Sequence, residues 1–346
     1  MVLGYNRHSV MVLLLCLLVL SSVRALVAAA GGRPPAMFVF GDSTLDVGNN
    51  NYLAGPNVPR ANKPYYGIDF PGSVPTGRFS NGYNIADYLA KSMGFASSPP
   101  PYLSLAPSTA RLVLTARGSG VSYASGGAGI LDSTSIYLFS IGSNDLFVFA
   151  TAQASASQNK SAADQRRDVA TLYTSLISNY TATITDLHAM GARKFAIINV
   201  GLLGCVPAAR LSSDGATGAC LDGLNELASG LDDALASLFA SLASRLPGFV
   251  YSLADYYGLS AATFDDPGAS GYTDVADACC GGGRLGAEAD CLPNATVCSN
   301  RDQHAFWDRV HPCQRGAMLA AQNFYDSRPG RYTAPINFKQ LAYTSL

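Results

Sequence analysis

The chain has little charge, and neither sign is in excess. Of its 346 residues, 23 are lysine or arginine and 24 are aspartate or glutamate, which gives a formal net charge of −1. Neither a basic stripe nor an acidic tail stands out, so nucleic-acid binding has no electrostatic support. The sequence contains no C-x-x-C pair, which argues against a zinc site, and no G-K-[ST], which excludes a phosphate loop.

The chain has one long apolar run, which lies at the N-terminus. Arg7 stands in a short polar start, residues 10–20 are almost unbroken apolar, and Ala28 to Ala30 offer an A-x-A cleavage pattern. This order predicts a secretory signal peptide over residues 1–30, with a signal anchor as the alternative. The run is too short to span a bilayer, and no second run of spanning length follows. We therefore expect a soluble, secreted mature protein.

Secretion changes what the cysteines predict. Cys16 leaves with the signal peptide, and seven cysteines remain: Cys205, Cys220, Cys279, Cys280, Cys291, Cys298 and Cys313. In an oxidising compartment most of them should pair. An odd number leaves one thiol over, and Cys313 is the candidate. Three N-x-S/T sequons, at Asn159, Asn179 and Asn294, also fit a secreted glycoprotein.

Short apolar runs alternate with amphipathic stretches along the rest of the chain. The expected strands are residues 36–40, 121–124, 136–141, 194–200 and 249–253, and the expected helices are residues 84–93, 165–190, 221–246 and 315–325. Leucines from Leu221 to Leu242 keep helical spacing, which indicates core packing rather than a partner zipper. This alternation predicts an α/β fold with a mostly parallel sheet covered on both faces. We expect a single domain over residues 31–346.

The first polar motif follows the first expected strand. Gly41 permits a tight turn there, and the turn can project the hydroxyl of Ser43 above the sheet as a nucleophile. Sites in folds of this kind gather beyond the carboxyl ends of the strands. A plain polar turn with a helix cap is the competing interpretation, because Ser and Asp are common at such positions.

A second motif near the C-terminus places Asp308 three residues before His311. An aspartate at this spacing can reach the imidazole Nδ1 and fix its tautomer, which leaves Nε2 free to take a serine proton. His188 is expected at the end or surface of a helix, and His304 in a structural role.

Two further elements offer donors to an oxyanion. Asn144 lies just past the third expected strand, and its side-chain amide can donate to a developing negative charge. A glycine-rich stretch, residues 125–129, follows the second strand, and the backbone N–H of Gly126 or Gly127 can approach the same oxygen. The sequence does not choose between these glycines. Tyr65, Tyr66 and Phe70, in a loop-like stretch, can line a carbohydrate or acyl groove or simply pack locally.

Together these motifs resemble the plant-type GDSL esterase/lipase family, a branch of the SGNH hydrolases. The resemblance covers nearly all of the mature chain, including residues 40–50 (FGDSTLDVGNN), 77–82 (GRFSNG), 124–131 (ASGGAGIL), 142–145 (GSND), 204–207 (GCVP), 279–281 (CCG), 306–312 (FWDRVHP) and 335–337 (PIN). It implies a three-layer α/β/α, flavodoxin-like fold with a mostly parallel five-stranded sheet.

The resemblance also implies the site. Ser43 would be the nucleophile, His311 the base and Asp308 the residue that orients it. The oxyanion hole would combine the Ser43 backbone N–H, Gly126 or Gly127, and the Asn144 side chain. The family hydrolyses carboxylic esters, in acyl lipids or in acetylated cell-wall polysaccharide, with no metal and no organic cofactor. We expect a monomer, extracellular or in the cell wall, with a small-molecule or polysaccharide ester as its substrate.

The chain departs from the family before the third strand. Only residues 130–135 separate Gly129 from Ile136, whereas family members carry several dozen residues there, including helix. A crossover between parallel strands needs a dozen or more residues. Three explanations stay open: a splice variant or incomplete gene model, loss of the second strand from the sheet, or a different loop.

A missing crossover helix would uncover apolar sheet area worth roughly 5–10 kcal/mol. An impaired or inactive form, which binds carbohydrate or lipid without turnover, is therefore the alternative function. A thiol hydrolase that uses Cys313 is a weaker alternative, because no separate His/Asp set faces that residue.

Overall fold

The structure, a computed structural model, describes residues 34, 36–55, 58–105, 120–124, 135–156, 160–212 and 218–345. All of them belong to one unit that begins at Pro34. The predicted signal peptide over residues 1–30, the sequon at Asn159, and both Gly126 and Gly127 lie outside the described residues. What the sequence predicts for these positions stays a prediction.

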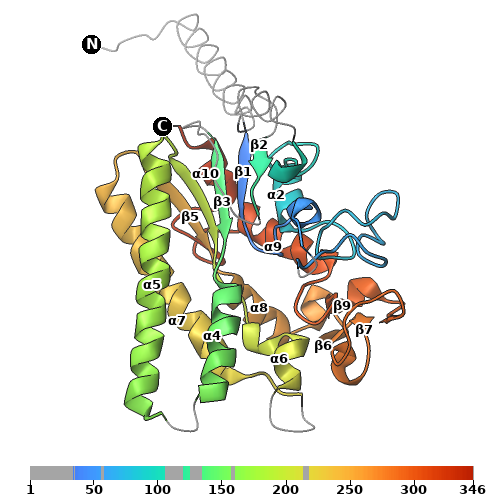
Figure 1. Ribbon diagram of the computed structural model, residues 1–346. Coiled ribbons are helices and arrows are strands. Elements are labelled where there is room, and N and C mark those ends of the chain that lie inside the picture. Colours follow the sequence, from blue (N-terminus) through green and yellow to red (C-terminus); the bar gives the residue numbers. More distant parts are fainter. Residues whose placement is uncertain are drawn as a thin grey trace, which may run out of the picture. The chain divides into compact units, whose positions relative to one another are not determined.

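A six-stranded sheet occupies the middle of the described unit (Figure 1). The strand order is β10-β5-β4-β3-β1-β2, with bounds β1 Met37–Gly41, β2 Gly120–Ser122, β3 Ile136–Ser140, β4 Lys194–Ile198, β5 Val250–Ala254 and β10 Thr333–Ala334. Strands β1 to β5 are parallel and match the five expected strands, whereas β10 pairs antiparallel with β5. The expectation of five strands is therefore short by one edge strand.

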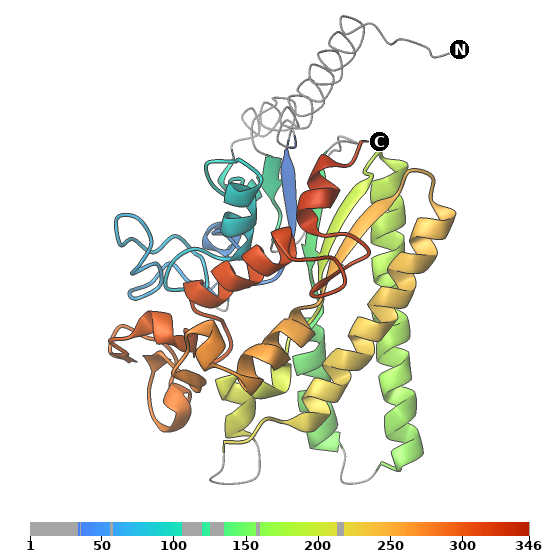
Figure 2. The same cartoon turned by 180° about the vertical axis from the view of Figure 1, so that it is seen from behind.

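Helices cover both faces of the sheet, as Figures 1 and 2 show from opposite sides. One face carries α5 (Ala162–Ala189) and α7 (Asp222–Arg245), and the other carries α2 (Ile85–Ser92), α9 (Gln314–Asp326) and α10 (Phe338–Tyr343). The predicted three-layer α/β/α fold is confirmed.

The sheet has this form because its strands are apolar on both faces. In β3, Tyr137 and Phe139 pack in the core layer under α5 and α7, while Ile136 and Leu138 pack in the layer under α2, α9 and α10. The leucine stripe of α7 faces the first of these layers, so it is core, as its spacing predicts.

The connection between β2 and β3 is longer than the sequence suggested. Phe38 of β1 pairs with Val121 on one side and with Tyr137 on the other. The strand β2 therefore keeps its place in the sheet, which excludes loss of the second strand, one of the three explanations left open. Because β2 already ends at Ser122, residues 123–135 form the connection, most of them outside the described residues. Strands two apart are separated by about 10 Å, which a connection of this length reaches easily. Residues Met37 to Val39 of β1 and Ile136 to Phe139 of β3 are buried, so these two strands expose no apolar face.

Shorter elements gather beyond the carboxyl ends of the parallel strands (Figure 1). The helices there are α4 (Ser143–Ala156), α6 (Pro207–Leu211) and α8 (Tyr256–Asp265), with a 3-10 turn η4 (Leu203–Cys205). Two small sheets follow, one of β6 (Asp274–Ala278) with β9 (His304–Phe306) and one of β7 (Cys280–Gly281) with β8 (Thr296–Val297). Further 3-10 turns are η1 (Asn49–Tyr52), η2 (Tyr102–Ser104), η5 (Gly268–Ser270), η6 (Arg284–Gly286) and η7 (Arg301–Gln303).

Three disulfides form among the cysteines, as expected for an oxidising compartment. They join Cys205 to Cys220, Cys279 to Cys298, and Cys280 to Cys291. Cys313 is unpaired and buried, which confirms it as the leftover thiol. No helix in the described part of the chain is long and apolar enough to cross a membrane.

Candidate active site

Ser43 lies in the turn that follows β1. A Cβ atom at Gly41 would lie 2.9 Å from Leu45 Cδ1 and 3.0 Å from the Ser140 carbonyl oxygen, so the chain needs glycine at the strand end. Asp42 then closes the turn, because its Oδ1 accepts hydrogen bonds from the backbone N–H of Thr44 at 2.9 Å and from its hydroxyl at 2.8 Å. None of the hydrogen bonds among the described residues uses the Ser43 backbone N–H.

Asp308 and His311 share another tight turn, ahead of α9. Asp308 Oδ1 accepts from the backbone N–H groups of Val310 at 3.0 Å and His311 at 2.9 Å, and His311 Nδ1 lies 2.9 Å from both carboxylate oxygens. His311 Nε2 lies 2.8 Å from Ser43 Oγ. The structure thus brings together three of the predicted residues in one hydrogen-bonded line, although Ser43 and His311 are 268 residues apart in the sequence.

The charges in this line support one another. Burial alone would raise the pKa of Asp308, but the neighbouring His311 and the hydrogen bonds to the carboxylate lower that pKa to about 2. Burial alone would lower the pKa of His311, but Asp308 and then Asp42 raise it above the usual value. The carboxylate therefore stays ionised, and the imidazole is a stronger base than an isolated histidine.

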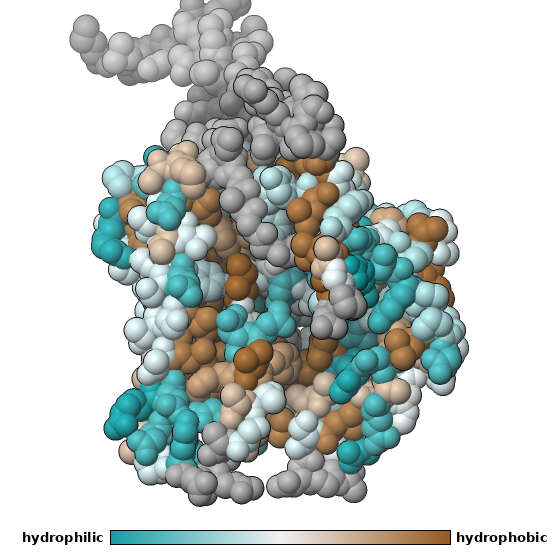
Figure 3. All heavy atoms as spheres, viewed as in Figure 1, coloured by the Kyte–Doolittle hydropathy of each residue, from teal (hydrophilic) through white to brown (hydrophobic). Residues whose placement is uncertain are grey.

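A pocket opens beside Ser43 and His311. It encloses about 140 Å³, and Asn144 lines it at the first turn of α4. Asn144 is exposed, while Gly126 and Gly127 are outside the described residues. On the face drawn in Figure 3, apolar residues gather in its middle, around α4 and α6.

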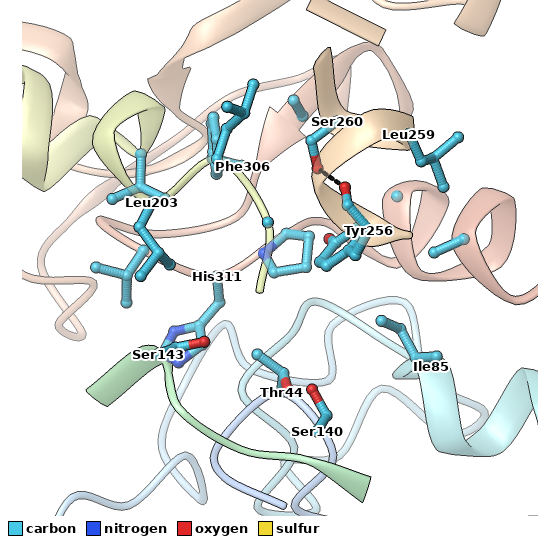
Figure 4. Close-up of a pocket in the computed structure, with 18 of the residues that line it drawn as sticks. Thr44, Ile85, Ser140, Ser143, Leu203, Tyr256, Leu259, Ser260, Phe306 and His311 are labelled. Carbon is cyan, nitrogen blue, oxygen red and sulfur yellow. Dashed lines mark hydrogen bonds between the residues drawn. The ribbon is translucent and has the colours of Figure 1, made fainter. Parts of the chain in front are cut away.

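The wall of the pocket is mostly apolar. Its apolar part includes Phe147, Leu203, Val206, Leu259, Phe264, Phe306 and Leu319. Two hydroxyls of the lining are used within α8, because Ser260 donates to the Tyr256 carbonyl at 2.7 Å and Thr263 to the Leu259 carbonyl at 2.9 Å. In Figure 4, Leu203, Phe306 and Leu259 lie across the pocket from Thr44 and Ser140. The arrangement suits an uncharged, apolar group next to the Ser43 hydroxyl.

The other candidate nucleophile and bases lie elsewhere. Burial raises the pKa of the Cys313 thiol well above its usual value, and Cys313 is absent from the pocket lining. His188 is buried and contacts the Pro247 carbonyl at 2.9 Å, and His304 faces Asp274 at 3.8 Å. These contacts give no support to a thiol hydrolase.

One contact of the site was missed by the sequence analysis. The hydroxyl of Tyr66 donates a hydrogen bond to Asp308 Oδ2 at 2.7 Å. The sequence offered Tyr66 only as a groove or packing residue. Its partner lies 242 residues further along the chain, so no local spacing signals the pair.

Fold and geometry define a class: a three-layer α/β/α protein in which a serine at a strand end faces a histidine oriented by an aspartate. Residues 37–324 match the GDSL-like lipase/acylhydrolase family, and the chain belongs to it. Membership of this family supports the hydrolysis of esters.

Several relatives in Arabidopsis thaliana are similar over most of their length. GDSL esterase/lipase At5g55050 is 34% identical, over 97% of this chain and 98% of the relative. GDSL esterase/lipase At1g71250 is 33% identical over 89% of both chains, and GDSL esterase/lipase 7 is 33% identical over 89% of this chain and 92% of its own. The alignment with the first extends over 380 positions, more than the 346 residues here, so this chain lacks residues that the relative has.

Proposed function

We propose that the protein is a secreted serine hydrolase that cleaves carboxylic esters through Ser43, His311 and Asp308. The observation that carries this proposal is the hydrogen-bonded line of these side chains, with 2.8 Å between Ser43 Oγ and His311 Nε2 and 2.9 Å between His311 Nδ1 and Asp308. All three belong to the residues matched by the family.

The reaction follows from this geometry. His311 Nε2 takes the Ser43 proton as the oxygen attacks the ester carbonyl, and Asp308 stabilises the imidazolium that forms. The Ser43 backbone N–H, the Asn144 amide and a glycine of residues 126–127 would donate to the oxyanion. When the intermediate collapses, His311 returns the proton to the leaving alcohol. Water then releases the acid from the acyl-enzyme by the same steps.

The pocket favours an acyl chain over a bare acetyl group. Most of its lining is apolar, and the Ser260 and Thr263 hydroxyls of α8 are bonded within that helix. Among the described residues that line it, Asp42 and His311 alone can carry charge. A sugar polymer needs many polar partners, and this mostly apolar wall offers few, so we favour apolar acyl esters as substrates, with acetylated cell-wall polysaccharide as the alternative.

Secretion belongs to the same proposal. A signal peptide over residues 1–30 would deliver the chain to the oxidising exterior or the cell wall, where the three disulfides are stable. The sequon residues Asn179 and Asn294 are exposed, as glycan attachment requires.

The test is the substitution Ser43→Ala, assayed on p-nitrophenyl butyrate and octanoate and on acetylated xylan. We expect turnover to fall by at least a thousandfold, with the far-UV circular dichroism unchanged. Ser244→Ala, an exposed serine of α7 whose hydroxyl contacts only its own helix, is the matched control and should keep full activity. Retained hydrolysis in Ser43→Ala would reject the proposal, and hydrolysis of the xylan alone would reject the acyl preference.

An inactive form is a second candidate, favoured by the short connection of residues 123–135, which contains both candidate oxyanion glycines. A fluorophosphonate probe separates the two, because only an activated serine reacts with it. Labelling of Ser43 in the wild type supports the hydrolase, whereas a folded but unlabelled protein supports the binding form.

A further inference from the structure

Tyr66 lies in a long loop, far in sequence from the residues that it contacts. Figures 1 and 2 show the loop, residues 58–84, beside the segment that leads from β9 into α9. The Tyr66 side chain is 6% exposed and Asp308 is 5% exposed, and 2.7 Å separates the phenol oxygen from Asp308 Oδ2. Water is therefore excluded from this hydrogen bond.

The Asp308 carboxylate has different donors on its two oxygens. Oδ1 accepts from the backbone N–H groups of Val310 and His311, which belong to the same turn. Oδ2 accepts from Tyr66, and its other partner among the described residues is the imidazole of His311 itself. Tyr66 is thus the one contact on Oδ2 that fixes the carboxylate independently of the imidazole.

Two ion pairs anchor the part of the loop that follows Tyr66. Asp69 makes a two-point ion pair with Arg301 at 2.6 and 2.7 Å, which ties the loop to the chain just before β9. A second two-point pair, between Arg78 and Asp87 at 2.6 and 2.7 Å, ties the loop to α2. Bidentate pairs of this kind fix orientation as well as distance.

Aromatic packing holds the Tyr66 ring itself. Its edge faces Phe79 at 6.2 Å and Trp307 at 6.4 Å between ring centres, and Phe79 also packs on the His311 ring at 5.0 Å. Rotation of the phenol away from Asp308 would break these contacts. The ring is therefore locked with its hydroxyl on the carboxylate.

We infer that Tyr66 is a positioning residue of the hydrolase: its hydroxyl holds Asp308 in the plane and charge state that His311 requires. This inference rests on the proposed function of Ser43, His311 and Asp308. Tyr66 does not line the pocket, so it acts on the rate through Asp308 rather than through substrate binding.

The hydroxyl has an electrostatic effect with a definite sign. By donating to Oδ2 it withdraws negative charge from the carboxylate, so the imidazolium of His311 is stabilised less than by an unbonded Asp308. Removal of the hydroxyl should raise the pKa of His311 further. The other titratable or charged groups that face these residues stay in place: Asp42 in the turn after β1, Cys313 before α9, and Lys63 and Asp290 near the Tyr66 ring.

The experiment compares Tyr66→Phe with Tyr65→Phe in the full secreted protein. The Tyr65 hydroxyl also makes a hydrogen bond, at 2.9 Å, but to the Pro293 carbonyl at the surface, so it is the matched control. We expect kcat per fluorophosphonate-titrated serine to fall about tenfold in Tyr66→Phe, with KM unchanged. We also expect the acid limb of kcat/KM to move to higher pH, by about half a unit. Tyr65→Phe should match the wild type in kcat, in KM and in the position of the acid limb.

A merely structural role gives a different result. If Tyr66 only stabilised the fold, Tyr66→Phe would lower the fraction of protein whose Ser43 reacts with the probe. The kcat and the pH profile of each reactive site would then match the wild type, and this result would overturn the inference. A fluorinated tyrosine at position 66, which keeps the hydroxyl and makes it a stronger donor, should move the acid limb to lower pH; an unchanged limb or a move to higher pH would also overturn it. Failure of the proposed function is distinct, because Ser43→Ala would then remain active.

Discussion

At the scale of single residues, His311 is set by opposing effects. Burial favours its neutral form, whereas Asp308 at 2.9 Å and the more distant Asp42 favour its charged form and win, so the pKa of His311 lies above its usual value. The general base of the proposed reaction must be neutral. Activity should therefore be lost below a pH that these two carboxylates determine.

Asp308→Asn tests this balance. The amide removes the charge that raises the pKa of His311, and burial then lowers that pKa, so the acid limb of kcat/KM should move to lower pH. The amide also fails to hold the required tautomer, so kcat should fall about 10³- to 10⁴-fold with little change in KM. A pH-rate profile per titrated serine measures both.

The control for that variant is Asp290→Asn. Asp290 is an exposed carboxylate near Asp308 in the chain and pairs with Arg309 at 2.9 Å. It should leave the pH profile at its wild-type position. A wild-type profile in Asp308→Asn would contradict the proposed role of Asp308.

At the scale of elements, periodicity explains what the sequence could predict. The five parallel strands are apolar runs, and the leucine spacing of α7 marks its buried face. Asp308 and His311 were found because their partnership is local, three residues apart. Their contact with Ser43 depends on the fold, and it was inferred because both motifs were expected beyond strand ends.

Other elements carry no such pattern. The helices α4 and α8 have no one-sided apolar stripe, and β10 has two residues, so their sequences contain no periodic signal. Tyr66 lies in an irregular loop whose position depends on two ion pairs. Asp69 pairs with Arg301, 232 residues further along the chain, and Arg78 pairs with Asp87 of α2, 9 residues further along. Contacts of this kind exist only after folding, which is why the sequence analysis missed them.

The junction of α7 with β4 supplies the next prediction. Asp232 of α7 accepts a hydrogen bond from the Val200 backbone N–H at 2.9 Å, but its Oδ2 is buried and has no partner among the described residues. Burial raises the pKa of Asp232 to about 8. The buried Asp232 carboxyl is therefore stable only in its protonated form. Its contribution to the free energy of unfolding is complete below about pH 4 and is lost as the pH rises towards 8.

Asp232→Asn keeps the acceptor for Val200 and removes the charge. We expect the free energy of unfolding at pH 8 to rise by about 2–4 kcal/mol, with a smaller gain at pH 5. Denaturant unfolding at the two pH values measures the difference. Glu226→Gln, an exposed position on the same helix, should change neither value, and equal effects of Asp232→Asn at both pH values would contradict the argument.

At the scale of the whole molecule, the proposed catalytic residues depend on a second, smaller core. Cys279, Cys280, Cys291, Trp307 and Tyr66 pack together there, apart from the two layers that flank the sheet. The Cys280 backbone N–H donates to the Trp307 carbonyl at 2.7 Å, directly before Asp308. The disulfide between Cys280 and Cys291 therefore supports the turn that carries Asp308 and His311.

Loss of this disulfide should affect the site before the sheet. In the double variant Cys280→Ala/Cys291→Ala we expect about 3 kcal/mol less stability in the segment around the bond. Because the sheet and its two helical layers do not include these cysteines, the far-UV circular dichroism should melt close to the wild-type temperature. Fluorophosphonate labelling of Ser43, which needs His311 in place, should be lost at a clearly lower temperature.

Cys205→Ala/Cys220→Ala removes a disulfide at the start of α7 instead, so labelling and circular dichroism should fall together there. If the two signals also fall together in the first variant, the small core does not support the site separately from the sheet.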